Sequence, residues 1–407
     1  MPTQPTPQSA ILRAVEENRS AMIEWTRRLV AIPTENPPGD CYSEAIDEIV
    51  GHLDRLGFTN TERAGDCVLS FVGEGEPTLY FSGHYDVVPA QERLQFEPQT
   101  RGVNLFGRGS SDMKSGLAAM TYAAKAFRDC KVPLHGRIGL VFVADEETAG
   151  PRGSRDLAAR GLLGKNGIGM LTPEPTGGVV WNANRGAITL QVTVHGKTAH
   201  VGRQFEGVNA FERMLPVANE LGRLKKEVEA RTTAYRIAPE AARRSILMMG
   251  GQAQAGTNFN VVPERFSFTV DRRINPEENF AGERRRLLAV FEAARKSGVE
   301  LEVKVLQEGA AAGTAEDVKL GRTLGKCIEQ ITGREAAFEM CPGLLETRFY
   351  AERGIPAFAY GPGLLTVSHG RHEFVPVERI VECAKIYALT AAEILSGSEA
   401  GGGIASQ

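Results

Sequence analysis

The sequence of 407 residues lacks the features that mark several classes of protein. It has only six cysteines, with no C-x-x-C pair, so it is not a disulfide-rich miniprotein, and free thiols in a reducing cytoplasm are expected. Its 47 Lys and Arg against 50 Asp and Glu give a net charge of −3, which disfavours a nucleic-acid binder. The longest apolar runs fall far short of the roughly 20 residues that span a bilayer. The first residues show no secretory signal pattern. We therefore expect a cytoplasmic protein without nucleic-acid or membrane partners.

What is present is an ordinary globular composition, with 42% hydrophobic and 24% charged residues. At about 150 residues per domain, the length predicts two or three domains. Short apolar runs at 78–82 and 138–143 have strand length, and the small-residue segment 116–127 between them reads as a helix. Such alternation predicts an α/β catalytic domain, with a mostly parallel central sheet flanked by helices.

The pattern changes near residue 185. Apolar and polar residues alternate in 188–195, 266–270 and 299–305, which predicts strands with one wet face. Helical patterns lie near 208–228 and 278–297. We therefore predict an inserted α+β domain over 185–306, and a catalytic domain made of 10–184 and 307–395 that ends in an amphipathic helix at 377–395. The segments 1–9 and 396–407 are expected to be flexible tails.

Histidine and carboxylate residues follow the predicted strands at their ends or in the loops after them. In open α/β sheets, ligands bind at the carboxyl ends of the strands, so these side chains can meet at one rim. Two His and three carboxylates can hold two borderline metals, most readily Zn²⁺, with Co²⁺ or Mn²⁺ as alternatives. The side chains at this rim are two histidines and five carboxylates, of which three would be metal ligands: His84, Asp86, Asp112, Glu146, Glu147, Glu174 and His369.

A serine mechanism is the competing interpretation of one of these motifs. Ser111-Asp-Met-Lys114 matches the S-x-x-K pattern of serine acyl-enzymes, and Lys197-Thr-Ala199 approaches K-T-G. The S-D-N element of that chemistry is missing from the sequence. A serine hydrolase remains an alternative that predicts indifference to chelators.

Several motifs, in order, resemble those of the dinuclear-metal amidohydrolases, which include acetylornithine deacetylase, succinyl-diaminopimelate desuccinylase, aminoacylase and glutamate carboxypeptidase. The resemblance covers about residues 20 to 395. The motifs are Gly83-His-Tyr-Asp-Val-Val-Pro89, Gly107-Arg-Gly-Ser-Ser-Asp-Met-Lys114, Asp145-Glu-Glu147, Glu174-Pro-Thr176, Gly196-Lys-Thr-Ala-His200, Asn260-Val-Val-Pro263, Asp271-Arg-Arg-Ile-Asn-Pro276 and His369-Gly-Arg-His-Glu373.

The resemblance implies a role for each matched residue. One metal would be held by His84 and Glu174, the other by Glu147 and His369, and Asp112 would bridge them. We expect their donor atoms to converge within a sphere of roughly 4–5 Å radius, as two adjacent metals require. The resemblance also implies a cis peptide bond between Asp112 and Met113.

The same resemblance implies the remaining catalytic and binding roles. Glu146 would be the general base and later the acid, and Asp86 would orient His84. The inserted domain would serve as a lid and as the dimer interface. His200 would stabilise the oxyanion in the partner subunit's site. Arg273, together with Asn260, would hold the substrate's carboxylate.

One segment departs from the family pattern. Relatives often carry a Gly-Gly-Thr run with an Asp before the Arg, whereas this chain has Cys341-Pro-Gly-Leu-Leu-Glu-Thr-Arg-Phe349. Glu346 replaces the acid, and Arg348 remains as a candidate substrate-binding residue. His372, where relatives often have Asn or Asp, is expected to be structural.

The sequence thus predicts a homodimeric, two-metal hydrolase that cleaves the amide bond of a small N-acyl amino acid. A dipeptidase or carboxypeptidase with the same metal site is the alternative. A metal-binding protein without catalysis is disfavoured because the base, Glu146, is present.

Overall fold

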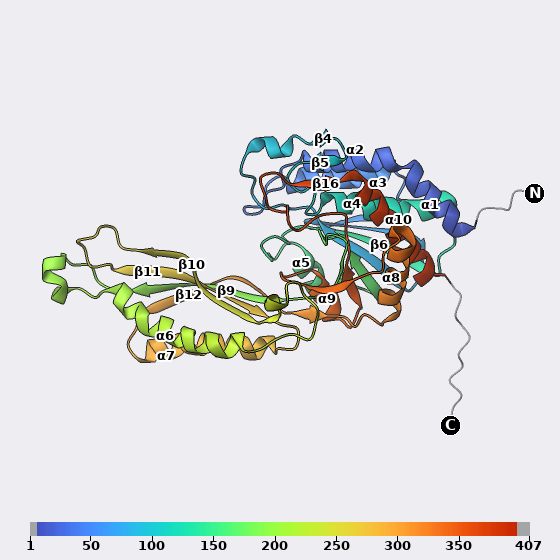
Figure 1. Cartoon of the computed structure of the whole chain (residues 1–407). Coiled ribbons are helices and arrows are strands. Elements are labelled where there is room, and N and C mark those ends of the chain that lie inside the picture. The colour runs from blue at the N-terminus through green and yellow to red at the C-terminus, as the bar shows by residue number, and fades with distance from the viewer. Residues whose placement is uncertain (1–5, 397–407) are drawn as a thin grey trace, which may run out of the picture. The chain divides into compact units, whose positions relative to one another are not determined.

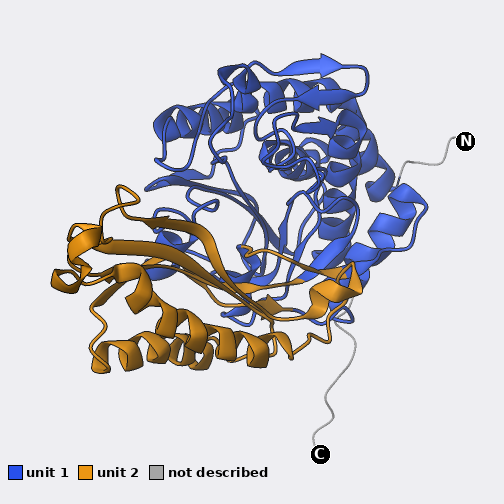
Figure 2. Cartoon of the chain, turned by 60° about the vertical axis from the view of Figure 1, so that its left-hand side comes forward, with its two compact units in different colours: residues 1–182, 314–338, 346–407 blue, residues 183–313, 339–345 orange. Residues whose placement is uncertain are grey.

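The computed structural model describes residues 6–396 and divides into two compact units, which are coloured separately in Figure 2. The first unit contains residues 1–182, 314–338 and 346–407, and the second contains 183–313 and 339–345. The predicted inserted domain, 185–306, is therefore shorter than the second unit of the structure. The strand near 301 continues to Gly309, where it still pairs with Ala187, and the segment 339–345 is held by a hydrogen bond from the Arg185 amide to the Gly343 carbonyl.

The predicted amino-terminal tail is also too long. Helix α1 (Pro7–Glu17) begins at a proline, and the side chain of Thr6 accepts a hydrogen bond from the Ser9 amide at 3.2 Å. A capping threonine followed by a proline in the first turn is a helix-start signal, and it explains why residues 7–9 are helical. The rest of the predicted tails, 1–5 and 397–407, lies outside the described residues.

The central sheet of the chain confirms the predicted α/β class, with parallel strands in the middle (Figure 1). Strands β6, β3, β7 and β15 run parallel to one another, while β1, β2, β8 and β13 extend the sheet in antiparallel pairs and β14 pairs with β8. The bounds are β1 Thr61–Ala64, β2 Cys67–Glu74, β3 Thr78–His84, β6 Gly136–Val143, β7 Gly167–Thr172, β8 Val180–Asn184, β13 Ala312–Gly313, β14 Phe338–Cys341 and β15 Ala357–Ala359.

Both faces of the middle of this sheet are covered, so the parallel strands there are mostly buried and do not alternate between buried and exposed residues. All seven residues of β3 are buried. Leu79 and Phe81 belong to the main core with most of the helices, whereas Tyr80 faces a smaller core that includes Leu157 and Tyr350. The helices of the first unit are α1, α2 Arg19–Val30, α3 Tyr42–Arg55, α4 Lys114–Cys130, α5 Ser154–Ala159, α8 Lys319–Thr332, α9 Thr347–Ala351 and α10 Val377–Ile394.

A small three-stranded sheet lies beside this core in the first unit. Strand β16 pairs with β5, which pairs with β4, so the segment after residue 370 is tied to the segment before residue 107. The elements are the 3-10 helix η1 Arg93–Phe96 and the strands β4 Gln99–Arg101, β5 Asn104–Phe106 and β16 Phe374–Pro376.

The second unit is a four-stranded antiparallel sheet in the order β10-β11-β9-β12, with helices α6 and α7. The predicted alternation is present over part of β9, since Leu190, Val192 and Val194 are buried in the core of this unit while Thr189 and Gln191 are partly exposed. Thr193 was expected on the exposed face but is buried. Its elements are β9 Gly186–His195, η2 Val201–Glu206, α6 Ala210–Glu229, η3 Glu240–Arg243, β10 Ile246–Ala255, β11 Arg265–Ile274, α7 Phe280–Lys296 and β12 Leu301–Gly309.

The helices and the cysteines of the described residues, 6–396, bear on two expectations from the sequence. None of the helices in this range is both long enough and apolar enough to cross a membrane. All six cysteines fall within the range and are free thiols.

Candidate metal centre

Three neighbouring parallel strands deliver acidic and imidazole side chains to one edge of the central sheet. His84 is the last residue of β3, Glu146 and Glu147 lie in the turn after β6, and Glu174 follows β7. Because β6, β3 and β7 are parallel neighbours, their carboxyl ends share this edge. Asp112 lies in the turn that precedes α4, and its peptide bond to Met113 is cis, as expected.

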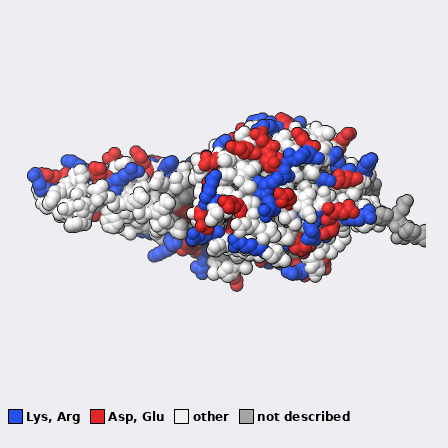
Figure 3. Space-filling model, turned by 90° about the horizontal axis from the view of Figure 1, so that it is seen from above, with Lys and Arg blue, Asp and Glu red and all other residues white. Residues whose placement is uncertain are grey.

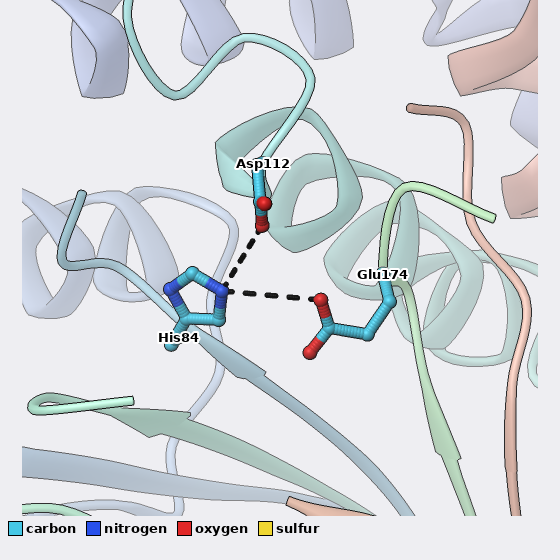
Figure 4. A group of neighbouring side chains, drawn as sticks. All are labelled: His84, Asp112 and Glu174. Atoms are coloured by element: carbon cyan, nitrogen blue, oxygen red, sulfur yellow. Dashed lines mark ion pairs between the residues drawn. The ribbon is translucent and has the colours of Figure 1, made fainter. Parts of the chain in front are cut away.

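The five predicted metal ligands form two groups that share Asp112. In the first group, His84 Nε2 lies 3.3 Å from Asp112 Oδ1 and 4.0 Å from Glu174 Oε2 (Figure 4). In the second, His369 Nε2 lies 3.4 Å from Asp112 Oδ2 and 3.2 Å from Glu147 Oε2. The ligand atoms of each group lie within 4.8 Å of one another. The two oxygens of Asp112 thus face different groups, as a bridging carboxylate must.

The polar atoms of the first group fit a cation that completes their environment. His84 Nε2 and Glu174 Oε1 are buried and have no hydrogen-bond partner among the described residues. Buried polar atoms are nearly always satisfied, so an unpartnered imidazole nitrogen beside an unpartnered carboxylate oxygen indicates a missing ligand. Histidine nitrogen with carboxylate oxygen is a donor set that suits Zn²⁺, Co²⁺ or Mn²⁺.

Crowding of the carboxylates also shifts their proton affinities. Burial, together with the neighbouring carboxylates, raises the pKa of Glu174 to about 8 and raises that of Glu146 well above its ordinary value. For Asp112, burial alone would raise the pKa, but the adjacent imidazoles of His369 and His84 outweigh burial and the pKa is lowered. Hydrogen bonds to Asp112 and Glu147 raise the pKa of His369 to about 10. Cations bound at these groups would compete with protons for the same oxygen and nitrogen atoms.

Glu146 lies beside the first group but belongs to neither of the two groups. Its Oε2 lies 4.0 Å from His84 Nε2, and its side chain is 13% exposed. Glu147, its neighbour in the chain, points instead toward His369. The two adjacent carboxylates therefore take different positions, Glu147 inside a ligand group and Glu146 outside both groups.

Asp86 contacts more than the imidazole that it was predicted to orient. His84 Nδ1 lies 2.9 Å from the carbonyl oxygen of Asp86 and 3.5 Å from its carboxylate oxygen Oδ1. The carboxylate also accepts hydrogen bonds from the amides of Glu146 and Glu147, each at 3.2 Å. Asp86 thus fixes the turn that carries both glutamates, and its backbone provides the closer contact to His84.

Asn36 is a site residue that the sequence analysis did not identify. Its Nδ2 donates to Asp86 Oδ2 at 2.8 Å and to Thr148 Oγ1 at 3.1 Å. Asn36 therefore joins the amino-terminal segment to the turn with Glu146. It lies in Asn36-Pro-Pro-Gly39, where an asparagine before two prolines is the only signal in the sequence, and its burial becomes known only from the structure.

Ser111 and Lys114 do not form a nucleophile and base. Ser111 Oγ donates to the Leu364 carbonyl and accepts from the Leu364 amide at 2.7 Å. Lys114 Nζ donates to the carbonyls of Leu29 and Ile32, at 2.9 and 2.7 Å. Both side chains are buried and hold backbone segments together, which leaves Ser111 without a base to activate it.

Three predicted residues lie in the second unit. His200 is exposed, and its Nδ1 accepts a hydrogen bond from the Gly202 amide at 3.1 Å, so a neutral His200 carries its proton on Nε2 and can donate there. The carbonyl of Asn260 accepts from the amide that follows His200, at 3.0 Å. Arg273 is bound through two nitrogens to Asp271, at 2.7 and 2.9 Å, so its fork already holds a carboxylate.

Arg348 does not fit the predicted role of a substrate-binding residue. It is only 2% exposed, lies 3.4 Å from Glu346 and stacks over the ring of Phe349. Glu346 is also buried, and burial raises its pKa although Arg348 opposes the shift. The acid that departs from the family pattern thus lies against the arginine inside the first unit. His372 is exposed.

Comparisons with known proteins show which family and which fold the chain is similar to. Residues 80–393 match the model of peptidase family M20/M25/M40. The chain is 29% identical over 330 residues to a succinyl-diaminopimelate desuccinylase of Thioalkalivibrio sulfidiphilus, across 77% of this chain and 83% of that protein. Its fold is similar to that of the di-peptidase Dug1p from Saccharomyces cerevisiae, with a TM-score of 0.78, 16% identity, and 96% and 99% of the two chains covered. It is also similar to the Bacillus subtilis YXEP protein, a dinuclear metal binding peptidase of family M20, with a TM-score of 0.67, 16% identity and coverage of 93% and 99%.

Proposed function

Because the chain belongs to peptidase family M20/M25/M40 and is therefore a metal-dependent hydrolase, we propose that it cleaves the amide bond of a small N-acyl amino acid with two metal ions. The observation that carries the proposal is the pair of ligand groups that share Asp112, with Glu146 beside them. A single carboxylate facing both groups is the arrangement that a two-metal hydrolase requires.

Each ion would be held by a defined set of residues. His84, Asp112 and Glu174 would hold one, and Asp112, Glu147 and His369 would hold the other. Zinc is the expected metal, with cobalt or manganese as alternatives. When bound, two such cations supply Lewis acidity, which polarises a carbonyl and lowers the pKa of water.

Glu146 would move the proton during hydrolysis. Its carboxylate would take a proton from the attacking water and deliver it to the departing amine nitrogen, so that the amide and water become an acid and an amine. The raised proton affinity of Glu146, which follows from its burial, suits a group that must hold this proton between the two steps. The two amide hydrogen bonds from the turn to Asp86 would keep it in place.

The second unit would contribute to substrate binding. His200, as a donor through Nε2, is suited to stabilise the developing oxyanion. The backbone of Asn260 is hydrogen-bonded to the residue after His200, and Asn260 would contact the substrate. Arg273 would bind the substrate's carboxylate only by sharing or releasing Asp271, so we expect an Arg273→Ala change to raise KM more than it lowers kcat.

The relatives support two substrate classes. The desuccinylase acts on an N-acyl amino acid, which favours our proposal, and the dipeptidase with a similar fold keeps a small peptide as the alternative. A screen of the metal-loaded chain against N-acetyl amino acids, N-succinyl amino acids and dipeptides separates the two. Preference for the acyl amino acids supports the proposal. Cleavage of dipeptides alone would replace it with a peptidase, and no amide hydrolysis in the presence of bound metal would contradict both.

We further propose a homodimer formed through the second unit, working in the cytoplasm. Large apolar side chains stay exposed on this unit, and such patches often mark interfaces. In the view of Figure 3, a broad area of the second unit carries few charged side chains. Free thiols suit a reducing compartment. Sedimentation of the native chain and of a Phe205→Glu, Phe259→Glu variant tests the dimer. The exposed residues are Val201, Phe205, Phe211, Leu215, Ile246, Met248, Phe259, Val305 and Leu306.

A further inference from the structure

A buried carboxylate outside the ligand groups holds the loop that presents the shared ligand. Glu373 is 2% exposed, and its Oε1 accepts hydrogen bonds from the amides of Gly109, Ser111 and Asp112, each at 3.0 Å. The last of these amides belongs to the bridging ligand itself. Three amides converging on one charged oxygen leave the loop little freedom, because turning any of them away would leave a buried donor unpaired.

The other oxygen of Glu373 connects this loop to the second histidine. Glu373 Oε2 binds Arg108, a side chain that is 1% exposed. Arg108 Nη2 donates onward to the carbonyl of His369 at 3.2 Å and to Gln91 Oε1 at 3.0 Å. Gln91 itself donates to the same His369 carbonyl at 3.0 Å. Asp112 and His369 are thus tied to one buried ion pair, although more than 250 residues separate them.

His369 needs such support more than the other ligands. Its side chain is 51% exposed and lies in a loop, whereas His84 is buried at a strand end. Its φ of +62° is in the left-handed region, which non-glycine residues seldom adopt without outside restraint. The hydrogen bonds at its carbonyl provide that restraint.

We propose that Glu373 is a positioning residue: it fixes Asp112 directly and His369 through Arg108, and so sets the metal affinity of the site. The inference rests on the proposed two-metal function. The two members of the ion pair are expected to affect different ligand groups. Glu373 supports the ligand that both groups share, whereas Arg108 is the link to His369, which serves only the group with Glu147.

Two single-site forms of the full chain make the test specific. Glu174→Gln removes a ligand of the first group and leaves Asp112, Glu147 and His369. Glu147→Gln removes a ligand of the second and leaves His84, Asp112 and Glu174. The metal-free forms are titrated calorimetrically with Zn²⁺, and the Co²⁺ absorption spectrum of each reports the ligand geometry. Residues outside the ligand set commonly change metal affinity by about 10–100-fold when altered.

Arg108→Lys is expected to lower Zn²⁺ affinity about 10–100-fold in the Glu174→Gln form, and by less than about threefold in the Glu147→Gln form. Glu373→Gln is expected to lower it in both forms. Glu278→Gln is the matched control, because Glu278 is a mostly buried carboxylate that binds Arg272 and accepts from the Asn275 amide in the second unit. It should lower the thermal midpoint of the metal-free chain without changing Zn²⁺ affinity.

The outcomes distinguish the inference from the proposed function. If the native chain binds two ions and the Glu373 and Arg108 variants bind them as tightly, the positioning role is wrong and the proposed function stands. If Arg108→Lys weakens both single-site forms equally, the assigned route to His369 is wrong. If the native chain binds no divalent ion, the proposed function fails, and the positioning role fails with it. Arg108→Lys keeps the test decisive if Glu373→Gln does not fold.

Discussion

Replacing Glu146 by glutamine tests the division of labour between two adjacent carboxylates. Glutamine keeps the size of the side chain and removes only its ability to take up a proton. Glu146 belongs to neither ligand group, and its Oε2 stays 4.0 Å from His84 Nε2, so the variant should keep both metal ions. A positioned acid–base group contributes about 10²–10⁴ in rate, which corresponds to about 2.7–5.4 kcal/mol of transition-state free energy.

Glu147→Gln is the matched comparison at the next position. Glu147 Oε2 lies 3.2 Å from His369 Nε2 in the second ligand group, so this variant should lose one ion per chain and its activity as well. Both variants are assayed for metal content by plasma mass spectrometry and for turnover on the best substrate of the screen, with the same preparation used for both measurements. The expected result is two ions with little turnover for Glu146→Gln, and one ion for Glu147→Gln.

One result would refute this reasoning directly. If Glu146→Gln binds two ions and turns over within a few-fold of the native rate, Glu146 is not the proton carrier. Asp86 would then be the next group to test, since its carboxylate lies against the same turn. Loss of metal from Glu146→Gln would instead mean that the side chain is a ligand.

Two further predictions concern packing and pH. Gly361→Ala should destabilise the metal-free chain by about 1–3 kcal/mol and weaken the ligand group that contains Glu174, because an added Cβ would lie 2.2 Å from the Pro173 carbonyl oxygen and 2.3 Å from that of Glu174; urea unfolding and Zn²⁺ titration check this, and unchanged values in both would contradict it. Burial and the charge of Arg28 lower the pKa of His52 from 6.5 to about 3 in the folded chain, so its contribution to stability is complete above pH 6.5 and is lost as the pH falls toward 3. His52→Phe should therefore lose less free energy of unfolding between pH 7 and pH 5 than the native chain, and an equal loss in the two would show that His52 is not the group responsible.

The site was largely predictable because several of its residues follow strands that the sequence marks strongly, whereas Asp112 and His369 lie in loops and were indicated by the resemblance of their motifs to the family. The apolar runs before His84 and Glu146 are continuous, and buried parallel strands have this pattern. A histidine or carboxylate at each strand end then needs only the common edge of the sheet to meet the others. The two-metal interpretation could therefore be reached before any coordinates.

The partners of individual side chains could not be predicted in the same way. Arg348 lies 3.4 Å from Glu346, and Arg273 is held by Asp271, because each arginine has a carboxylate within two residues along the chain. The spacing in the sequence permits such ion pairs, but it does not show whether an arginine binds the nearby carboxylate or the carboxylate of a substrate. Arg348 is buried and so does not face a substrate, and its burial becomes known only once the helices are packed on the sheet.

The structural supports were missed for a related reason. Glu373 and Arg108 lie inside motifs that had already been noted, but their roles depend on hydrogen bonds between segments far apart in the chain. The unit boundary was misplaced because residues 339–345 return to the second unit by hydrogen bonds from backbone atoms, which carry no signature in side-chain type. The start of α1 was readable from Thr6 and Pro7.

The central claim is that two metal ions held by these five residues are required for amide hydrolysis. Its most direct test is to strip the chain with a chelator, add Zn²⁺ in steps, and follow bound metal and hydrolysis of an N-acyl amino acid in the same samples. We predict no turnover without metal and activity that rises until two ions are bound per chain. Hydrolysis that persists in the metal-free chain, or saturation at a single ion with full activity, would contradict the claim.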